Sequence, residues 1–120
     1  DLEEINSAEG IILPGVGAFN EAMNNLNELG ISNILKKRVY DGIPLFGICL
    51  GLQLLFTKSE EFGTGLGLDL INGTIKRFPN FFNEKKLKVP HVAWNTIIKD
   101  KIEWKTTPFS DLKNDQYIVL

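Results

Sequence analysis

The sequence predicts an α/β fold with an open parallel sheet, helices on both of its faces, and extra antiparallel strands in the second half. The first observation is that the apolar runs at residues 11–13 and 44–48 show no polar alternation, which is typical of strands buried on both faces. The second is that a segment with helical periodicity follows each run. Because successive strand–helix units pair in parallel, this order favours a parallel sheet.

The segment between these two strands predicts a turn and two helices. Residues 14–17 form a glycine-rich turn directly after the first strand. Apolar residues at helical spacing predict a helix over residues 20–29, and Gly30 is placed to stop it. Ser32 is expected to cap a second short helix that ends at Gly42.

The pattern changes after the second strand. Residues 50–56 predict a helix, but beyond Ser59 the chain is punctuated by glycines and loses its helical periodicity. Residues 74–78, 88–99 and 117–120 have strand character, and no long helix separates them. We therefore expect antiparallel or irregular additions to the sheet in this half.

Composition excludes several classes of function. The 120 residues suffice for one domain, and a net charge of −2 offers no basic surplus for nucleic acid. The longest apolar stretch, residues 43–56, is too short and too interrupted to span a membrane. One Cys and one His make neither a disulfide nor a zinc site, so we expect no cofactor and a cytoplasmic setting. The chain begins without Met and ends within a predicted strand, so we expect a piece that is incomplete at both ends.

Cys49 lies between Gly47 and Gly51, where the second strand passes into the next helix. A sharp strand-to-helix turn needs small neighbours at those two positions. Such a turn would raise the sulfur at the carboxyl edge of the sheet, and the helix N-terminus would favour its thiolate. A lone Cys in an apolar stretch is usually a buried small hydrophobe. The glycine pair instead favours a nucleophile that cleaves an amide.

Backbone amides around Cys49 are predicted to hold developing negative charge. The N–H of Leu50 follows the nucleophile directly. Gly15, Val16 and Gly17 end the neighbouring strand, and consecutive N–H groups in such a turn can bind an oxyanion. A simple tight turn is the alternative interpretation of these residues. Because both turns lie at the carboxyl edge of a parallel sheet, they are expected to face one pocket.

Three segments carry a resemblance to a known family: ILPGVGAF at residues 12–19, GICLGLQLLF at 47–56 and VPHVAWN at 89–95. In this order they closely resemble the glutaminase subunits of imidazole glycerol phosphate synthase, which are class I (triad) glutamine amidotransferases of histidine biosynthesis. The elbow at 47–56 alone would indicate only the superfamily. Ala93 departs from the pattern, because a Gly is usual there. The resemblance spans nearly the whole chain and implies a flavodoxin-like fold.

The resemblance implies a mechanism without a cofactor. Cys49 would attack the side-chain amide of glutamine, form a thioester as ammonia leaves, and release glutamate after hydrolysis. The glycine-rich turn and the Leu50 amide would hold the oxyanion, while Gly51 and Gln53 would help to seat glutamine. From the residues alone, Gln53 could equally be a solvated helix residue. Ammonia would pass to a (βα)8-barrel synthase subunit.

The resemblance also bears on the only histidine. His91 belongs to the 89–95 segment, which in the family faces the synthase, so His91, Trp94 and Asn95 are predicted to serve a partner interface rather than catalysis. Trp94 could also be an ordinary core residue. The triad His and Glu are expected after Leu120, so residues 1–120 alone form a partial amidotransferase domain that we expect to be inactive.

Other interpretations stay open on the sequence alone. A paralogue with the same elbow could supply ammonia for amidation of a surface sugar. A truncated or degenerate copy could serve as a binding module without catalysis. An unrelated elbow hydrolase would cleave esters and be indifferent to glutamine.

Overall fold

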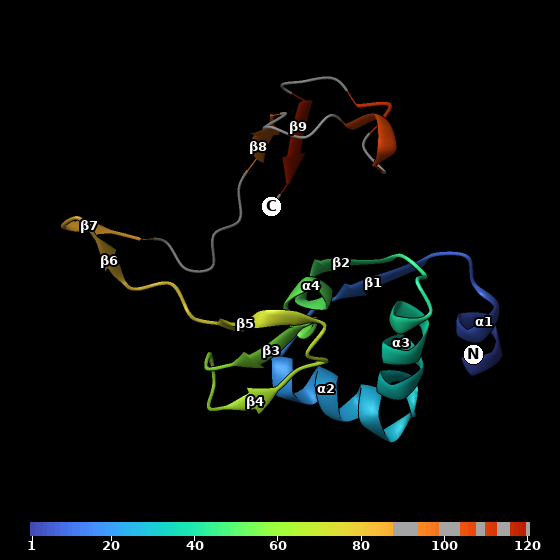
Figure 1. The fold of residues 1–120 in the computed structure, drawn as a ribbon. Helices are drawn as coiled ribbons and strands as arrows, with labels where there is room; N and C mark the ends of the chain where they lie inside the picture. The colour runs from blue at the N-terminus through green and yellow to red at the C-terminus, as the bar shows by residue number, and fades with distance from the viewer. Residues whose placement is uncertain (88–93, 99–103, 108–109, 113–115, 120) are drawn as a thin grey trace. The chain divides into compact units, whose positions relative to one another are not determined.

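The computed structural model describes residues 1–87, 94–98, 104–107, 110–112 and 116–119 (Figure 1). The chain divides into two compact units, Asp1–Arg77 and Phe78–Leu120.

The first unit alternates helices and strands before it ends in a small sheet. Its elements are α1 (Leu2–Ser7), β1 (Ile11–Gly15), α2 (Phe19–Glu28), α3 (Ile31–Tyr40), β2 (Leu45–Cys49), α4 (Leu50–Leu54), β3 (Phe56–Ser59), β4 (Gly65–Leu66) and β5 (Ile71–Ile75). The sequence had not predicted α1. None of the described helices is long and apolar enough to cross a bilayer.

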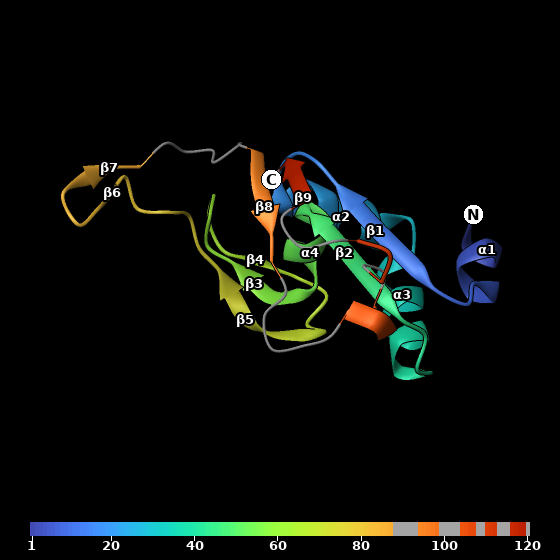
Figure 2. The ribbon, with the colours of Figure 1, turned by 90° about the horizontal axis from the view of Figure 1, so that it is seen from above.

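β1 and β2 form a parallel two-stranded sheet, visible from above in Figure 2. Their register pairs Ile11 with Leu45 at one end and Gly15 with Cys49 at the other. The predicted α/β class with parallel strands is therefore confirmed. The register brings the two predicted site turns to the same edge, because parallel strands end together.

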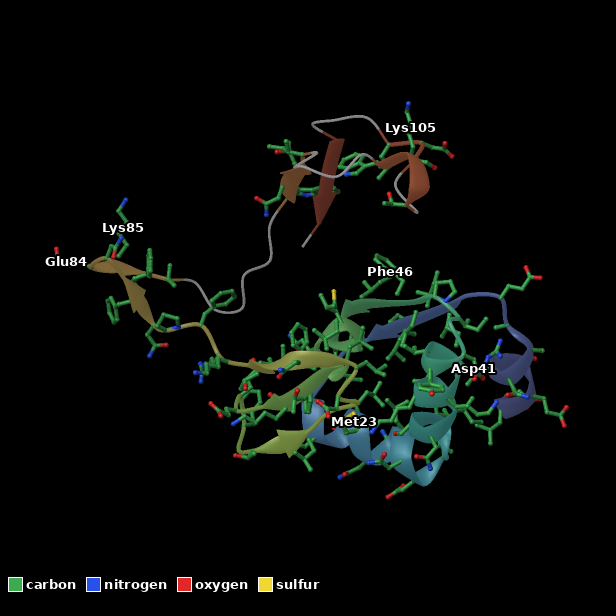
Figure 3. All side chains as sticks on the ribbon, in the orientation of Figure 1. Met23, Asp41, Phe46, Glu84, Lys85 and Lys105 are labelled. Carbon is green, nitrogen blue, oxygen red and sulfur yellow. The ribbon has the colours of Figure 1, made fainter. Side chains whose placement is uncertain are left out.

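The core of this unit lies on one face of the β1–β2 sheet. Buried side chains from α2, α3, α4 and the segment after α4 pack together there, and alternate residues of the two strands pack against them. The buried members are Phe19, Met23, Leu35, Leu50, Leu54, Leu55 and Leu68. The opposite face carries the exposed side chains of Ile12, Phe46 and Ile48. Figure 3 shows Phe46 pointing away from the helices, whereas Met23 lies among them. Within the first unit, the helices α2, α3 and α4 therefore supply the core on one face of the sheet.

A separate three-stranded sheet follows α4, in the order β4-β3-β5. β3 pairs with β5 in parallel and with β4 antiparallel. The predicted helix over residues 50–56 is too long, because α4 ends at Leu54 and Phe56 already begins β3. Residues 74–78 were predicted as a strand, and β5 instead begins at Ile71 and ends at Ile75.

The predicted cap of the second helix is also wrong. α3 begins one residue before Ser32, with Gly30 as its N-cap at φ 69°. Ser32 is buried inside the helix, where its hydroxyl donates a hydrogen bond to Asn27 Oδ1 at 2.6 Å. The side chain of Ser32 therefore joins the ends of α2 and α3 instead of capping the backbone.

The second unit contains short antiparallel pairs. β6 (Phe81–Phe82) pairs with β7 (Lys85–Lys86), and β8 (Trp94–Ile97) pairs with β9 (Gln116–Val119). A 3₁₀ turn, η1 (Trp104–Thr106), lies between β8 and β9 in the chain. Extra antiparallel strands in this half are therefore confirmed, but within the described residues they form separate two-stranded sheets and do not extend the β1–β2 sheet. Among the same residues, β8 covers only part of the predicted 88–99 strand.

Candidate active site

Cys49 ends β2 and precedes α4, as a nucleophile on a strand-to-helix turn must. Its backbone has φ 53° and ψ −120°, a region that residues other than glycine rarely occupy. Its side chain is exposed and is not in a disulfide. An unfavourable conformation of this kind persists only where the surroundings enforce it, and such residues cluster at functional sites.

The two glycines around Cys49 enforce this turn by close packing. A Cβ at Gly47 would lie 2.6 Å from the Leu52 Cα, and a Cβ at Gly51 would lie 1.8 Å from the Leu13 carbonyl oxygen. Neither approach is possible for a real side chain, and both obstacles are backbone atoms. Each glycine is therefore required so that the start of α4 can lie against β2 and β1.

The glycine-rich turn lies beside Cys49 at the end of β1. Gly15 is the register partner of Cys49, and a Cβ there would come within 3.0 Å of the Gly51 nitrogen. Val16 is 94% exposed, and Gly17 has φ 103° with nothing within 4 Å of an added Cβ. The backbone after Gly15 is thus open to solvent next to the cysteine. The close packing of Gly15 against α4 was not foreseen, because it depends on strand register.

The two other predicted site residues of α4 lie within its first turns. Leu50 is the first helical residue, so its N–H has no partner within the helix, while its side chain is buried in the core. Gln53 is half-buried one turn further on. The structure therefore brings Cys49, the Leu50 amide and the end of β1 together, and Gln53 follows them on the same short helix.

An apolar cleft lies at the other end of β2. Its volume is about 270 Å³, and its lining includes Val39, Ile43, Leu45, Leu55 and Ile71. These residues surround the amino end of the strand, whereas Cys49 is at the carboxyl end. The cleft is consequently separate from the candidate nucleophile.

The ion pair at the end of β3 is not part of the Cys49 turn either. Lys58 Nζ lies 2.6 Å from Glu60 Oε1, and the hydrogen bond and charge of Lys58 lower the pKa of Glu60. The pair is exposed to solvent, where such pairs contribute little stability. In the described part of the chain, no group of three His, Cys, Asp or Glu side chains could hold a metal ion.

The glutamine amidotransferase class-I family matches residues 1–119. The chain belongs to this family. The family has a flavodoxin-like fold and uses a cysteine nucleophile, which agrees with the fold class predicted from the sequence.

Curated amidotransferase relatives share nearly half of their aligned residues with the chain. The HisH subunit of imidazole glycerol phosphate synthase from Geobacillus thermodenitrificans is 49% identical over 98 residues, which are 81% of this chain and 46% of the relative. The subunit from Lactococcus lactis subsp. lactis is 44% identical over 116 residues, 97% of this chain and 54% of the relative. That from Geobacter metallireducens is 42% identical over 116 residues, 95% of this chain and 54% of the relative. The chain thus spans about half the length of these relatives.

The predicted interface residues of this amidotransferase chain lie in its second unit. His91 lies outside the described residues. Trp94 begins β8 and is 70% exposed, so it is not a core residue in this structure. Asn95 is half-buried on the same strand, opposite Ile118 of β9. A role for these residues in partner binding stays a prediction.

Proposed function

We infer that this chain is the nucleophile-bearing part of a glutaminase that supplies ammonia to imidazole glycerol phosphate synthase, in histidine biosynthesis. The observation that carries the proposal is the backbone of Cys49, at φ 53° and ψ −120° between two glycines that have no room for a side chain. Membership of the amidotransferase family and the identity to HisH subunits support the same assignment.

The proposed chemistry begins at the Cys49 sulfur. The thiolate attacks the side-chain carbonyl carbon of glutamine, and the carbonyl oxygen takes up the negative charge of a tetrahedral intermediate. Collapse of this intermediate breaks the C–N bond and, with a proton added to nitrogen, releases ammonia and leaves a γ-glutamyl thioester. Water then attacks the thioester, which frees glutamate and restores the thiol.

The backbone around Cys49 supports the oxyanion step. The N–H of Leu50 is not used within α4, and the open turn of Gly15, Val16 and Gly17 lies beside the nucleophile through the Gly15–Cys49 register. Donors fixed by the fold need little reorganisation when charge develops, which is why such amides accelerate acyl transfer. We propose that Gly51 and Gln53 help to bind glutamine at the same site.

We propose that the second unit contacts the synthase subunit. His91, Trp94 and Asn95 would face a (βα)8-barrel synthase subunit that consumes the ammonia. An exposed Trp is a common anchor of protein interfaces, because it buries a large area at small entropic cost. We propose that both subunits act in the cytoplasm.

Glutamine hydrolysis by the intact protein tests this proposal. With the synthase subunit present, Cys49→Ala is expected to lower kcat by about a thousandfold or more, since the variant lacks the sulfur that forms the proposed thioester. Leu52→Ala is the matched control, because Leu52 is exposed on the same helix. Acid-quenched wild-type protein should carry a γ-glutamyl adduct on residue 49 in mass spectra.

The same experiment separates the competing functions. Full glutaminase activity in Cys49→Ala would overturn the mechanism. No glutaminase activity in the wild-type protein with any ammonia acceptor would favour a binding module. Stimulation by a sugar-modifying synthetase, but not by the barrel synthase, would indicate the sugar-amidating paralogue.

A further inference from the structure

The turn that follows β1 is packed at its two ends and open in its middle. At the first end, a Cβ added to Gly15 would lie 3.0 Å from the Gly51 nitrogen. In the middle, Val16 is almost fully exposed, and a Cβ added to Gly17 would meet nothing within 4 Å. At the far end, α2 begins at Phe19, whose side chain is only 4% exposed. Among the described residues, Gly17 thus gives the turn its shape, whereas the two ends set its place.

The ring of Phe19 lies against two glycines that belong to β4 and the residue after it (Figure 1). A Cβ added to Gly65 would lie 3.3 Å from Phe19 Cδ1, and one added to Gly67 would lie 3.2 Å from Phe19 Cζ. Both distances are shorter than the roughly 3.5–4.0 Å at which non-bonded carbons pack best. Alternate residues of an extended segment point to the same side, so the two glycines together form one surface. Gly65 and Gly67 are called the glycine seat below.

Backbone hydrogen bonds tie the segment that carries the glycine seat to the helix that begins after Cys49. Directly after the seat, the Leu68 N–H donates to the Leu54 carbonyl at 2.8 Å, and the Leu70 N–H donates to the Leu55 carbonyl at 2.8 Å. Leu54 is the last residue of α4 and Leu55 is its C-cap. The carbonyls at a helix C-terminus have no partner within the helix, so these bonds use groups that are otherwise free. The glycine seat is therefore fixed to the element whose first turn follows the cysteine.

We propose that Phe19 is a positioning residue for oxyanion binding, because its ring on the glycine seat fixes where the amides after Gly15 lie relative to Cys49. The proposal rests on the proposed function, which assigns the oxyanion to this turn. Phe19 is buried, so it acts through the backbone that precedes it and not by touching the substrate. A displacement of about 1 Å at a reacting centre can cost a hundredfold in rate, and oxyanion donors are effective only when the fold holds them in place.

The alternative interpretation is that Phe19 only fills the core, and Met23 provides the comparison. Met23 is 6% exposed, lies one helical turn further along α2 and belongs to the same hydrophobic cluster (Figure 3). Shortening either side chain should destabilise the protein, because both are buried. Only Phe19 is the first residue of the helix and directly follows the turn. The two positions therefore separate packing from positioning.

The decisive experiment compares Phe19→Leu with Met23→Val in glutamine hydrolysis by the intact protein with the synthase subunit. Both variants are assayed at a temperature where circular dichroism shows them folded. Phe19→Leu is expected to lower kcat about tenfold and to leave KM within about twofold, since the oxyanion forms only after glutamine has bound. Met23→Val should keep both constants within about twofold of wild type. If Phe19→Leu does not fold, Phe19→Met keeps more of the side-chain volume and should show the same split with a smaller loss.

Alkylation of Cys49 by iodoacetamide tests the cysteine without the oxyanion donors. The thiolate sulfur bonds to the methylene carbon as iodide leaves, and no oxyanion forms, so the rate depends on the thiolate and its access. Phe19→Leu is therefore expected to react within about twofold of wild type. An alkylation rate that falls as far as kcat would mean that Phe19 supports the cysteine itself, and would overturn the proposal. Unchanged kcat in Phe19→Leu, or an equal loss of kcat in Met23→Val, would overturn it as well.

Failure of the proposed function gives a different result in the same series. A wild-type protein that is alkylated at Cys49 but does not hydrolyse glutamine, even with the synthase subunit, overturns the proposed function and the positioning role with it. A wild-type protein that hydrolyses glutamine, with a Phe19→Leu variant that matches its kcat, overturns the positioning role alone.

Discussion

The turns that end β1 and β2 lie side by side at one sheet edge, but they are held in different ways. At the Cys49 turn, an added Cβ on Gly51 would lie 1.8 Å from the Leu13 carbonyl oxygen. At the turn after Gly15, an added Cβ on Gly17 would have nothing within 4 Å, and Val16 is 94% exposed. The first turn is fixed by packing, and the second by the conformational freedom of one glycine.

This difference matches the groups that the two turns expose, a cysteine side chain in one and backbone amides in the other. A cysteine at φ 53° is strained by about 1–3 kcal/mol, and only a surrounding structure that leaves no alternative maintains it. The β1 turn presents backbone amides, for which an open glycine at φ 103° suffices. If Cys49 is the nucleophile, as proposed, it would need these close contacts on several sides, whereas a turn that offers backbone amides would need space in front of it.

The largest expected effect is at the packed turn. Gly51→Ala should lower the free energy of unfolding by about 3 kcal/mol or more, because the clash is with backbone that cannot rotate away. Chemical denaturation of the purified protein measures this loss. Gly10→Ala is the control: the nearest atom to its added Cβ is 3.7 Å away, so stability should change by less than about 0.5 kcal/mol. Equal stability of the two variants would contradict the packing argument.

The packed turn was predictable because its signals are local. Two glycines flanking a Cys between an apolar run and a helix specify the turn within five residues. The parallel pairing of the two strands was also predictable, because uninterrupted apolar runs are typical of strands in such sheets. The Gly15–Cys49 register could not be predicted, since strand register is set by contacts between residues far apart in the sequence.

Two predictions were wrong because contacts with other elements override the local sequence pattern. Ser32 looked like a cap, but a buried hydrogen bond to Asn27 places it inside α3. Phe56 continues the helical pattern of α4, yet β5 pairs with it as a strand. α1 carried local signals, since Asp1 caps it by accepting a hydrogen bond from the Glu3 N–H. A helix of six residues is too short for periodicity to reveal it.

A substitution at Gly17, in the open turn after β1, should lower stability through backbone strain alone. Gly17→Ala is expected to cost about 1–2 kcal/mol of stability, because alanine is disfavoured at φ 103° although no atom obstructs it. Val16→Ala, its neighbour in the same turn, should stay within about 0.5 kcal/mol, since Val16 is almost fully exposed. Denaturation curves of the two variants and the wild type give both values. A Gly17→Ala loss as large as that of Gly51→Ala would mean that the second turn is packed as well.

The smallest expected effect on stability has the opposite sign and lies at Cys49, the proposed nucleophile. Cys49→Gly should abolish glutaminase activity yet raise the free energy of unfolding by about 1 kcal/mol. Relief of the strain at φ 53° exceeds the roughly 0.5–1 kcal/mol by which glycine favours the flexible unfolded chain.

Cys49→Ala separates strain from loss of the sulfur, because alanine keeps the Cβ and hence the strain. We expect Cys49→Gly to be the more stable of the two in parallel denaturation curves. If Cys49→Ala were equally or more stable, the backbone at residue 49 would be unstrained. The close packing of Gly47 and Gly51 would then serve only to join α4 to the sheet, and not to hold the nucleophile in an unfavourable conformation.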